Sequence, residues 1–163
     1  MASPPATDDA NTILQRVVDR NHADYNWMIV EVDSGGRVKC INTGLGLDDL
    51  TQSLQDDKIQ WAVLRAVGVD QQDNVTSRRA KIVQINWVGP RVPAMKRMGA
   101  LSGKSVITSF AQGAQVTLDF NDKNDITMVT LGKALLQRGG AHKPTHYDFG
   151  GDCSIALTEL GYH

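Results

Sequence analysis

The residue types most suited to chemistry gather in a glycine-rich stretch, GALSGKS, at 99–105. It is close to the phosphate-loop pattern, in which successive backbone N–H groups and a lysine hold phosphates. That pattern requires glycine where Met98 stands, and it should follow a strand directly, whereas the helix-like AMKRM precedes this stretch. Lys104 is therefore interpreted as a solvent-facing residue of a helix and not as part of a nucleotide site.

A second group of reactive side chains lies near the C-terminus. His142 and His146 form an H-x₃-H pair, but zinc needs two further ligands at suitable spacing. Cys153 is near, Cys40 is remote in sequence, and Pro144 separates the histidines. The sequence contains no defensible Ser–His–Asp arrangement. We therefore predict no catalytic residue, no metal site, no cofactor and no enzymatic activity, and we expect both cysteines to be reduced thiols.

Positive charge is concentrated in the middle of the chain. The chain has a net charge of −1, yet the segment between Asn74 and Leu118 contains no acid and seven bases: Arg78, Arg79, Lys81, Arg91, Lys96, Arg97 and Lys104. The remaining residues carry 10 bases and all 18 acids. Such polarisation indicates a basic surface for an anionic partner. Nucleic acid is disfavoured, because the pI is about 6.4 and Trp87, itself predicted to be core, is the one aromatic in 77–99.

Hydrophobic periodicity predicts the elements that hold these residues. An amphipathic helix capped by Thr7 opens the chain, and a polar loop at 70–79 is expected to join the two strongest strands. We predict strands at 26–33, 37–44, 58–69, 80–89 and 114–120, and helices near 47–54, at 94–101, at 103–113 with Ser102 as cap, and at 124–140 with Gly139 as stop. The order predicts an α/β fold of the α+β type: one domain with a mixed sheet of about five strands and helices on both faces.

The two ends of the chain are weakly patterned. Residues 1–6 contain Pro4 and Pro5, and the glycine-rich C-terminal stretch shows no clear period, so 1–6 and 149–163 are expected to be flexible tails. No apolar run approaches the roughly 20 residues needed to cross a bilayer. The N-terminal stretch has acids where a signal peptide has bases. These features predict a cytoplasmic protein without a membrane partner.

Several segments together carry a resemblance to a known family. YNWMIVEVD followed by a glycine turn, then WAVLRAVGVD, SRRAKIVQINWVG and AMKRM, stand in the order found in the actin-depolymerising-factor homology (ADF/cofilin) family. The chain resembles most closely the coactosin branch, over residues 7–148. The resemblance implies the ADF-H fold, binding to actin filaments, an association with the cytoskeleton and a monomer that performs no covalent chemistry.

The resemblance also implies which residues bind actin. Lys81 matches the basic residue that coactosins use for filament binding, and the adjacent Arg78 and Arg79 extend it. Positions on the following helix match a stretch that cofilin-type members press against actin: Lys96, Arg97 and Met98, with Lys104 one helical segment further on. The expected function is regulation of filament dynamics without strong severing. Two alternatives stay open: a cofilin-like depolymerising or severing factor, and a non-actin interaction module on the same fold.

Overall fold

The computed structural model describes residues 9–139 and 143–161, so the expected tail at 1–6 and the expected cap Thr7 lie outside the described residues. Its helices are α1 (Ala10–Val18), α2 (Leu47–Ser53), α3 (Ala94–Arg97), α4 (Gly99–Phe110) and α5 (Met128–Arg138), with 3-10 turns η1 (Lys123–Asp125) and η2 (Leu157–Leu160). Its strands are β1 (Trp27–Val32), β2 (Val38–Gly44), β3 (Ile59–Gln72), β4 (Val75–Val88), β5 (Val116–Phe120), β6 (His146–Asp148) and β7 (Ser154–Ala156). No helix of this described part is long and apolar enough to cross a bilayer.

The strands form one mixed sheet in the order β2-β1-β3-β4-β5. β4 and β5 are parallel and the other pairs are antiparallel, so the predicted mixed sheet of about five strands is confirmed. Two short strands were not predicted: β6 pairs with β3, and β7 pairs with β6. Residues 149–161 therefore fold onto the sheet, and the expectation of a flexible tail is wrong for them. Three-residue strands are too short to produce a visible period in the sequence.

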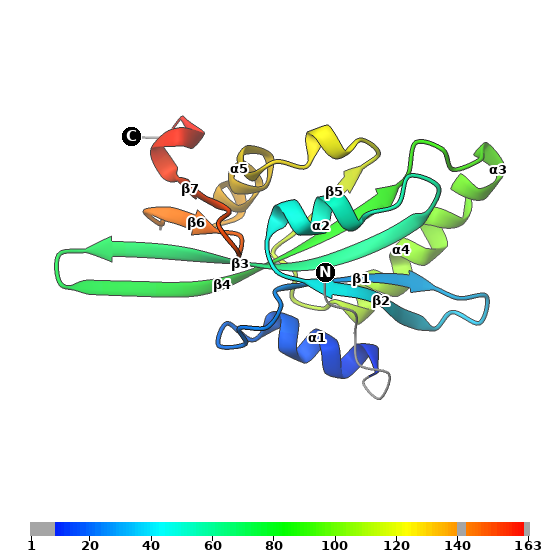
Figure 1. The fold of residues 1–163 in the computed structure, drawn as a ribbon, viewed down its shortest axis with the longest axis horizontal. Coiled ribbons are helices and arrows are strands. Elements are labelled where there is room, and N and C mark those ends of the chain that lie inside the picture. Colours follow the sequence, from blue (N-terminus) through cyan, green and yellow to red (C-terminus); the bar gives the residue numbers. More distant parts are fainter. Residues whose placement is uncertain (1–8, 140–142, 162–163) are drawn as a thin grey trace.

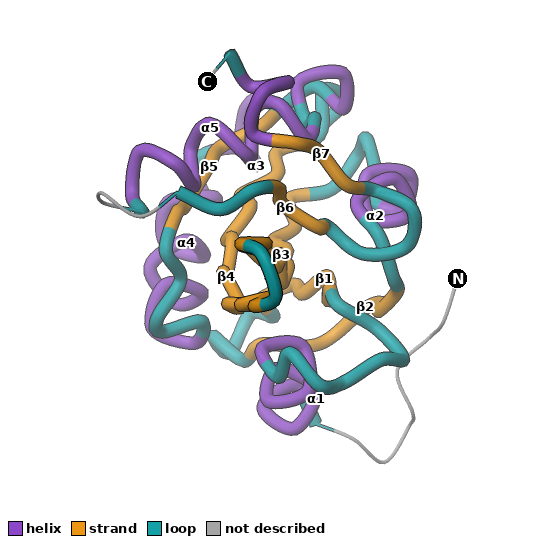
Figure 2. Tube along the Cα trace, turned by 90° about the vertical axis from the view of Figure 1, so that its left-hand side faces the viewer, coloured by secondary structure: helices purple, strands orange, loops and turns teal. Residues whose placement is uncertain are grey.

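Helices cover both faces of the sheet, as predicted (Figures 1 and 2). α1 and α4 cover one face, where Ile13, Val17 and Ile107 pack against Trp61 and Ile82. α2 and α5 cover the other face, over a larger core formed by Leu50, Leu131 and Leu135 with residues of β3 and β4, including Val83, Ile85 and Trp87. Successive side chains of β4 alternate between these two cores, as the period of a strand requires. Trp87 is fully buried, which confirms its predicted place in the core.

A long hairpin dominates the sheet. β3 and β4 are each 14 residues long and stay in register from Ile59 opposite Val88 to Gln72 opposite Val75. The expected loop at 70–79 is therefore wrong: only Asp73 and Asn74 form the turn, and Asp73 has a φ of 49°. A two-residue turn of this kind favours residues that tolerate positive φ, such as Asp and Asn. The outer part of this hairpin, 70–77, projects beyond β6 and is called the arm here (Figure 1).

The helix ends differ from the expected ones in three places. Asp9 caps α1 and accepts a hydrogen bond from the Thr12 amide at 2.8 Å. The two predicted helices, 94–101 and 103–113, are separated at Met98 and not at Ser102. Ser102 lies inside α4, and its hydroxyl donates to the Gly99 carbonyl instead of capping a helix. Thr127 caps α5, three residues later than the predicted start. The predicted stop at Gly139 is confirmed.

Two buried polar side chains tie distant segments to the sheet. Asn26 lies beside the start of β1; its side-chain amide donates to the carbonyls of Arg65 and Phe149 at 2.9 and 2.8 Å and accepts from the Gly46 amide at 2.9 Å. The Arg65 guanidinium donates to carbonyls at and just after the end of α1: those of Arg16, Val17, Asp19 and His22. A cation suits this end of a helix, because its last carbonyls carry partial negative charge.

Candidate actin-binding surfaces

The first three predicted site residues lie on β4 at the base of the arm, and they are called the strand cluster here: Arg78, Arg79 and Lys81. Arg79 and Lys81 share the face of the sheet that carries α5 and line a small hollow with Tyr147. Burial raises the pKa of the Tyr147 phenol above its ordinary value. Lys81 is half-buried.

Arg78 lies on the opposite face of β4 from its two neighbours in the strand cluster. It lines a surface hollow with Arg20 and Asn21, next to the end of α1. Its guanidinium is 3.9 Å from a carboxylate oxygen of Asp148 on β6. The side chains of Arg78 and Arg79 therefore cannot act together on a flat partner, because consecutive residues of a strand point to opposite faces.

The next three predicted residues lie at α3 and the break that follows it: Lys96, Arg97 and Met98. They are exposed, together with Met95 and Leu101, and these five residues are called the helix cluster here. Met95, Met98 and Leu101 are 90%, 82% and 76% exposed, which is unusual for three large apolar side chains so close in sequence. An exposed apolar patch with cations beside it is typical of a surface that binds another protein.

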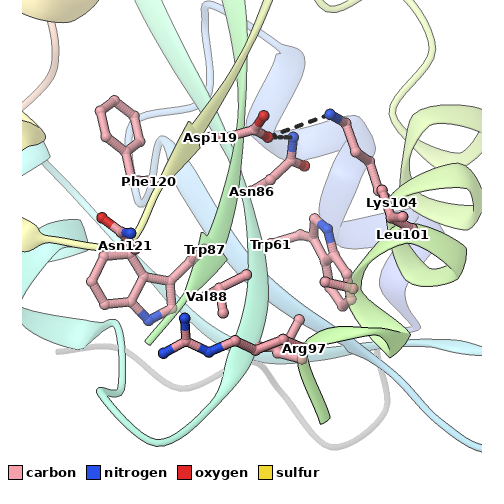
Figure 3. A pocket seen from close by; sticks show the side chains of 12 residues that line it. Trp61, Asn86, Trp87, Val88, Arg97, Leu101, Lys104, Asp119, Phe120 and Asn121 are labelled. Carbon is pink, nitrogen blue, oxygen red and sulfur yellow. Dashed lines mark hydrogen bonds and ion pairs between the residues drawn. The ribbon is translucent and has the colours of Figure 1, made fainter. Parts of the chain in front are cut away.

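Lys104 lies one turn further along α4, and its side chain is already engaged. Its ammonium is 3.4 Å from a carboxylate oxygen of Asp119 at the end of β5, and the Asn86 amide donates to the same oxygen at 2.7 Å (Figure 3). Residues 99–105 all lie in α4 and not in a loop. Their backbone therefore does not form a phosphate-binding loop. The structure supports the reading of Lys104 as a helix residue, although it is less solvated than expected.

The two clusters lie in separate parts of the molecule. Figure 1 shows the arm at one end of the long axis and α3 at the other. From Arg79 to Val88 the strand β4 covers roughly 30 Å, at about 3.3 Å per residue. The structure thus brings the predicted residues into two separate regions and not into one continuous face. Lys104 belongs with the helix cluster, since it lines the same cavity as Arg97.

Most of the central bases have no acidic partner. Of the seven bases between Asn74 and Leu118, the described part of the chain pairs Arg78 with Asp148 and Lys104 with Asp119. The other five form no ion pair among the described residues: Arg79, Lys81, Arg91, Lys96 and Arg97. The field of these cations is therefore directed at the solvent or at a partner.

Sequence reasoning missed some members of these surfaces. Met95 and Leu101 were read only as parts of helices, since a helical apolar residue more often faces a core. Asp148 was placed near a flexible tail, yet it neutralises Arg78. His146 lies in β6, whereas His142 lies outside the described residues, and no group of three or more metal-ligating side chains gathers within the described ranges.

Comparisons with known proteins place the chain in a family. Residues 4–135 match the family described as cofilin/tropomyosin-type actin-binding protein. Coactosin of Entamoeba histolytica is 26% identical over 139 residues, which cover 82% of this chain and 82% of that protein. Drebrin-like protein of Mus musculus is 24% identical over 143 residues, which cover 87% of this chain but only 31% of that protein. The chain thus spans about a third of that longer relative.

Solved structures show the same fold. The crystal structure of coactosin from Entamoeba histolytica superposes with a TM-score of 0.69 and 18% identity, over 82% of this chain and 96% of that one. Human coactosin-like protein gives a TM-score of 0.65 with 18% identity, over 83% of this chain and 99% of that one. The fold is therefore the ADF-H fold, as expected. With the family match covering most of its length, the chain belongs to the cofilin/tropomyosin-type actin-binding protein family.

Proposed function

We propose that this protein binds the sides of actin filaments through the helix cluster and the strand cluster, and that it regulates filament dynamics without strong severing. The observation that carries the proposal is the set of five unpaired cations in a segment without acids, among the described residues. Membership in an actin-binding family supports actin as the partner. A solved relative, mouse coactosin, is titled an actin filament binding protein and has the same fold, with a TM-score of 0.59 and 22% identity.

The helix cluster has the composition of a contact that holds a partner. Met95 and Met98 offer apolar surface that is almost entirely exposed in the free protein. The aliphatic stems of Lys96 and Arg97 extend this surface, while their charged heads remain available for acidic groups. Covering such a patch removes apolar area from water, and it accounts for most of the affinity that a small surface can supply.

The strand cluster has the composition of a contact that attracts and orients. Arg79 and Lys81 supply positive charge on one face of β4, and no large apolar side chain of the described residues is exposed beside them. Charged side chains without exposed apolar neighbours mainly raise the association rate and fix the orientation of the partner. They add less to the affinity. Because the two clusters lie far apart along the hairpin of β3 and β4 and the helices that follow it, they suit a polymer, whose neighbouring subunits offer repeated acidic surfaces.

Co-sedimentation with actin filaments at low and at moderate salt tests the proposal. We expect pelleting that saturates with protein concentration and weakens as salt rises, because exposed charges are screened. Absence of pelleting at both salt concentrations contradicts filament binding. Filament lengths measured by fluorescence microscopy test the second part, and we expect them to change little at saturating protein. Rapid shortening of the filaments contradicts the proposal and supports a cofilin-like severing factor.

The proposal assigns no catalytic residue and no cofactor to the chain. We place the protein in the cytoplasm, on the cytoskeleton, as a monomer that binds neither nucleic acid nor membrane. Sedimentation equilibrium at micromolar concentration tests the monomer, since the mass of one chain is 17.8 kDa. A mass of twice that value contradicts it.

A further inference from the structure

A cavity of about 430 Å³ lies beneath the start of α4 (Figure 3). Its floor is formed by the ends of strands: Ile59 begins β3, Val88 ends β4 and Phe120 ends β5. Its roof is formed by Ala100 and Leu101 in the first turn of α4. The volume falls in the range of roughly 300–1,000 Å³ that is typical of small-molecule sites.

The position of α4 explains why the cavity exists. α4 touches the sheet closely at Gly103, where a Cβ atom would lie 2.3 Å from the Trp61 ring. The contact continues at Ile107, which is fully buried. The first turn of α4 and the preceding α3 extend past this contact and overhang the strand ends. The overhang leaves a space that no side chain of the described residues fills.

The walls of the cavity are mostly apolar. Phe120 presents aromatic surface, with the almost fully buried rings of Trp61 and Trp87 behind the lining, and Ile59, Val88 and Leu101 present aliphatic surface. Leu101 is 76% exposed, so an occupant beneath it would cover apolar surface that is now in water. The walls therefore favour a ligand with an apolar, preferably aromatic, body.

One charge in the lining is uncompensated. Lys104 and Asp119 neutralise each other, and Asn86 donates to the same carboxylate oxygen. Arg97 donates only to backbone carbonyls, those of Val92 at 3.1 Å and Pro90 at 3.5 Å. Asp56 and Asp122 line the next hollow on the far side of Arg97, with Lys123, but neither forms an ion pair with it in the described structure.

We propose that this cavity binds a small organic anion that has an aromatic or branched aliphatic body and one carboxylate or sulfonate group. The guanidinium of Arg97 receives the anionic group, since it can donate two parallel hydrogen bonds to such a group. The apolar body lies between Leu101 and the aromatic wall. The cavity shares Arg97 and Leu101 with the helix cluster, and its occupation is tested without actin.

The probe is 8-anilino-1-naphthalenesulfonate, an aromatic monoanion whose fluorescence rises in apolar surroundings. Because Trp61 and Trp87 lie beside the cavity, energy transfer from tryptophan to the probe reports its binding to the protein, and the variants below locate the site. We expect saturable binding of one probe per chain to the native protein. N-phenyl-1-naphthylamine, which lacks the sulfonate, is expected to bind at least tenfold more weakly. Absence of saturable binding, or equal affinity for the neutral compound, overturns the proposal.

Two pairs of variants locate the site. Arg97→Gln is expected to weaken the probe at least tenfold, whereas Arg91→Gln, which removes the same charge from the preceding exposed loop, is expected to change it less than twofold. Ala100→Trp fills the cavity and is expected to abolish binding, while Ser105→Trp on the exposed side of α4 is expected to leave it unchanged. Circular dichroism and thermal melting verify that each variant is folded. Equal effects within either pair overturn the assignment.

Discussion

The two ends of the molecule carry positive charge in different settings. At the helix end, Lys96 and Arg97 stand beside methionines that are 90% and 82% exposed, and no acid of the described residues pairs with them. At the strand end, Arg78 is paired with Asp148 and Lys81 is half-buried. The difference teaches that equal charge does not imply an equal contribution. We propose that the helix end holds a partner and that the strand end orients one.

The largest effect is expected at Asn26, which anchors the strand end from within. Asn26→Ala leaves three buried backbone groups without their partners, and we expect the free energy of unfolding to fall by about 3 kcal/mol. Urea denaturation measures this loss, with Asn124→Ala, an exposed asparagine, as a control that changes little. Amide exchange is expected to accelerate at β6 and at 149–153 before it does at α4. Uniform acceleration contradicts a local anchoring role.

The next largest effect compares how much exposed apolar side chains at the two ends contribute to filament binding. Met98→Asp is expected to weaken filament binding about 30-fold, because it replaces exposed apolar contact with a charge that acidic actin repels. Val75 at the tip of the arm is also exposed, at 68%, so Val75→Asp is the matched variant. We expect it to weaken binding less than threefold in co-sedimentation. Similar losses for both variants would erase the proposed difference between the two ends.

A smaller effect is expected at Lys81. Lys81→Ala should weaken filament binding about fivefold at low salt and leave the fold intact, because the ammonium group makes no ion pair with any described residue. The loss should shrink as salt rises, and the salt dependence of the affinity should become shallower than that of the parent protein. A loss that stays constant with salt indicates a packing effect and not the expected electrostatic one.

The smallest expected effect is an increase in affinity for actin filaments. Asp148→Asn removes an acid beside Arg78 and releases its guanidinium, and we expect filament binding to tighten about twofold, in line with the small value of exposed ion pairs. Asp152→Asn removes an exposed acid from the neighbouring loop, away from Arg78, and controls for net charge. Equal tightening by both variants indicates that overall charge, and not the release of Arg78, is responsible.

Most of the fold could be predicted because its signals are local. The apolar runs around Val63 and Val83 mark two central strands, and Gly139 marks the end of a helix. The arm was read as a loop because its residues, such as Gln71 and Ser77, are polar. They form strands because each residue of the arm pairs with a residue on the opposite strand. That pairing depends on the tertiary structure and cannot be inferred from the type of a single residue.

The candidate site could be predicted by residue type but not by arrangement. The lack of acids around Lys81, Lys96 and Arg97 is visible in the sequence. Whether a strand residue points to one face or the other depends on the register, and Arg78 and Arg79 consequently diverge. The pairing of Lys104 with Asp119 depends on the parallel placement of β5 beside β4, which joins residues that are 15 positions apart.

The hairpin of β3 and β4 also has a mechanical meaning. Its strands remain paired along 14 residues each, and they run along the axis that separates the two clusters. A pull on the two clusters in opposite directions is therefore carried by the covalent backbone of β4, which joins them, while the pairing with β3 stiffens that strand. The hairpin also holds the strand cluster and the helix cluster at a fixed distance from each other. Inserting two residues in each strand lengthens it by about 7 Å, which puts the two contacts out of step with the repeat of a polymer.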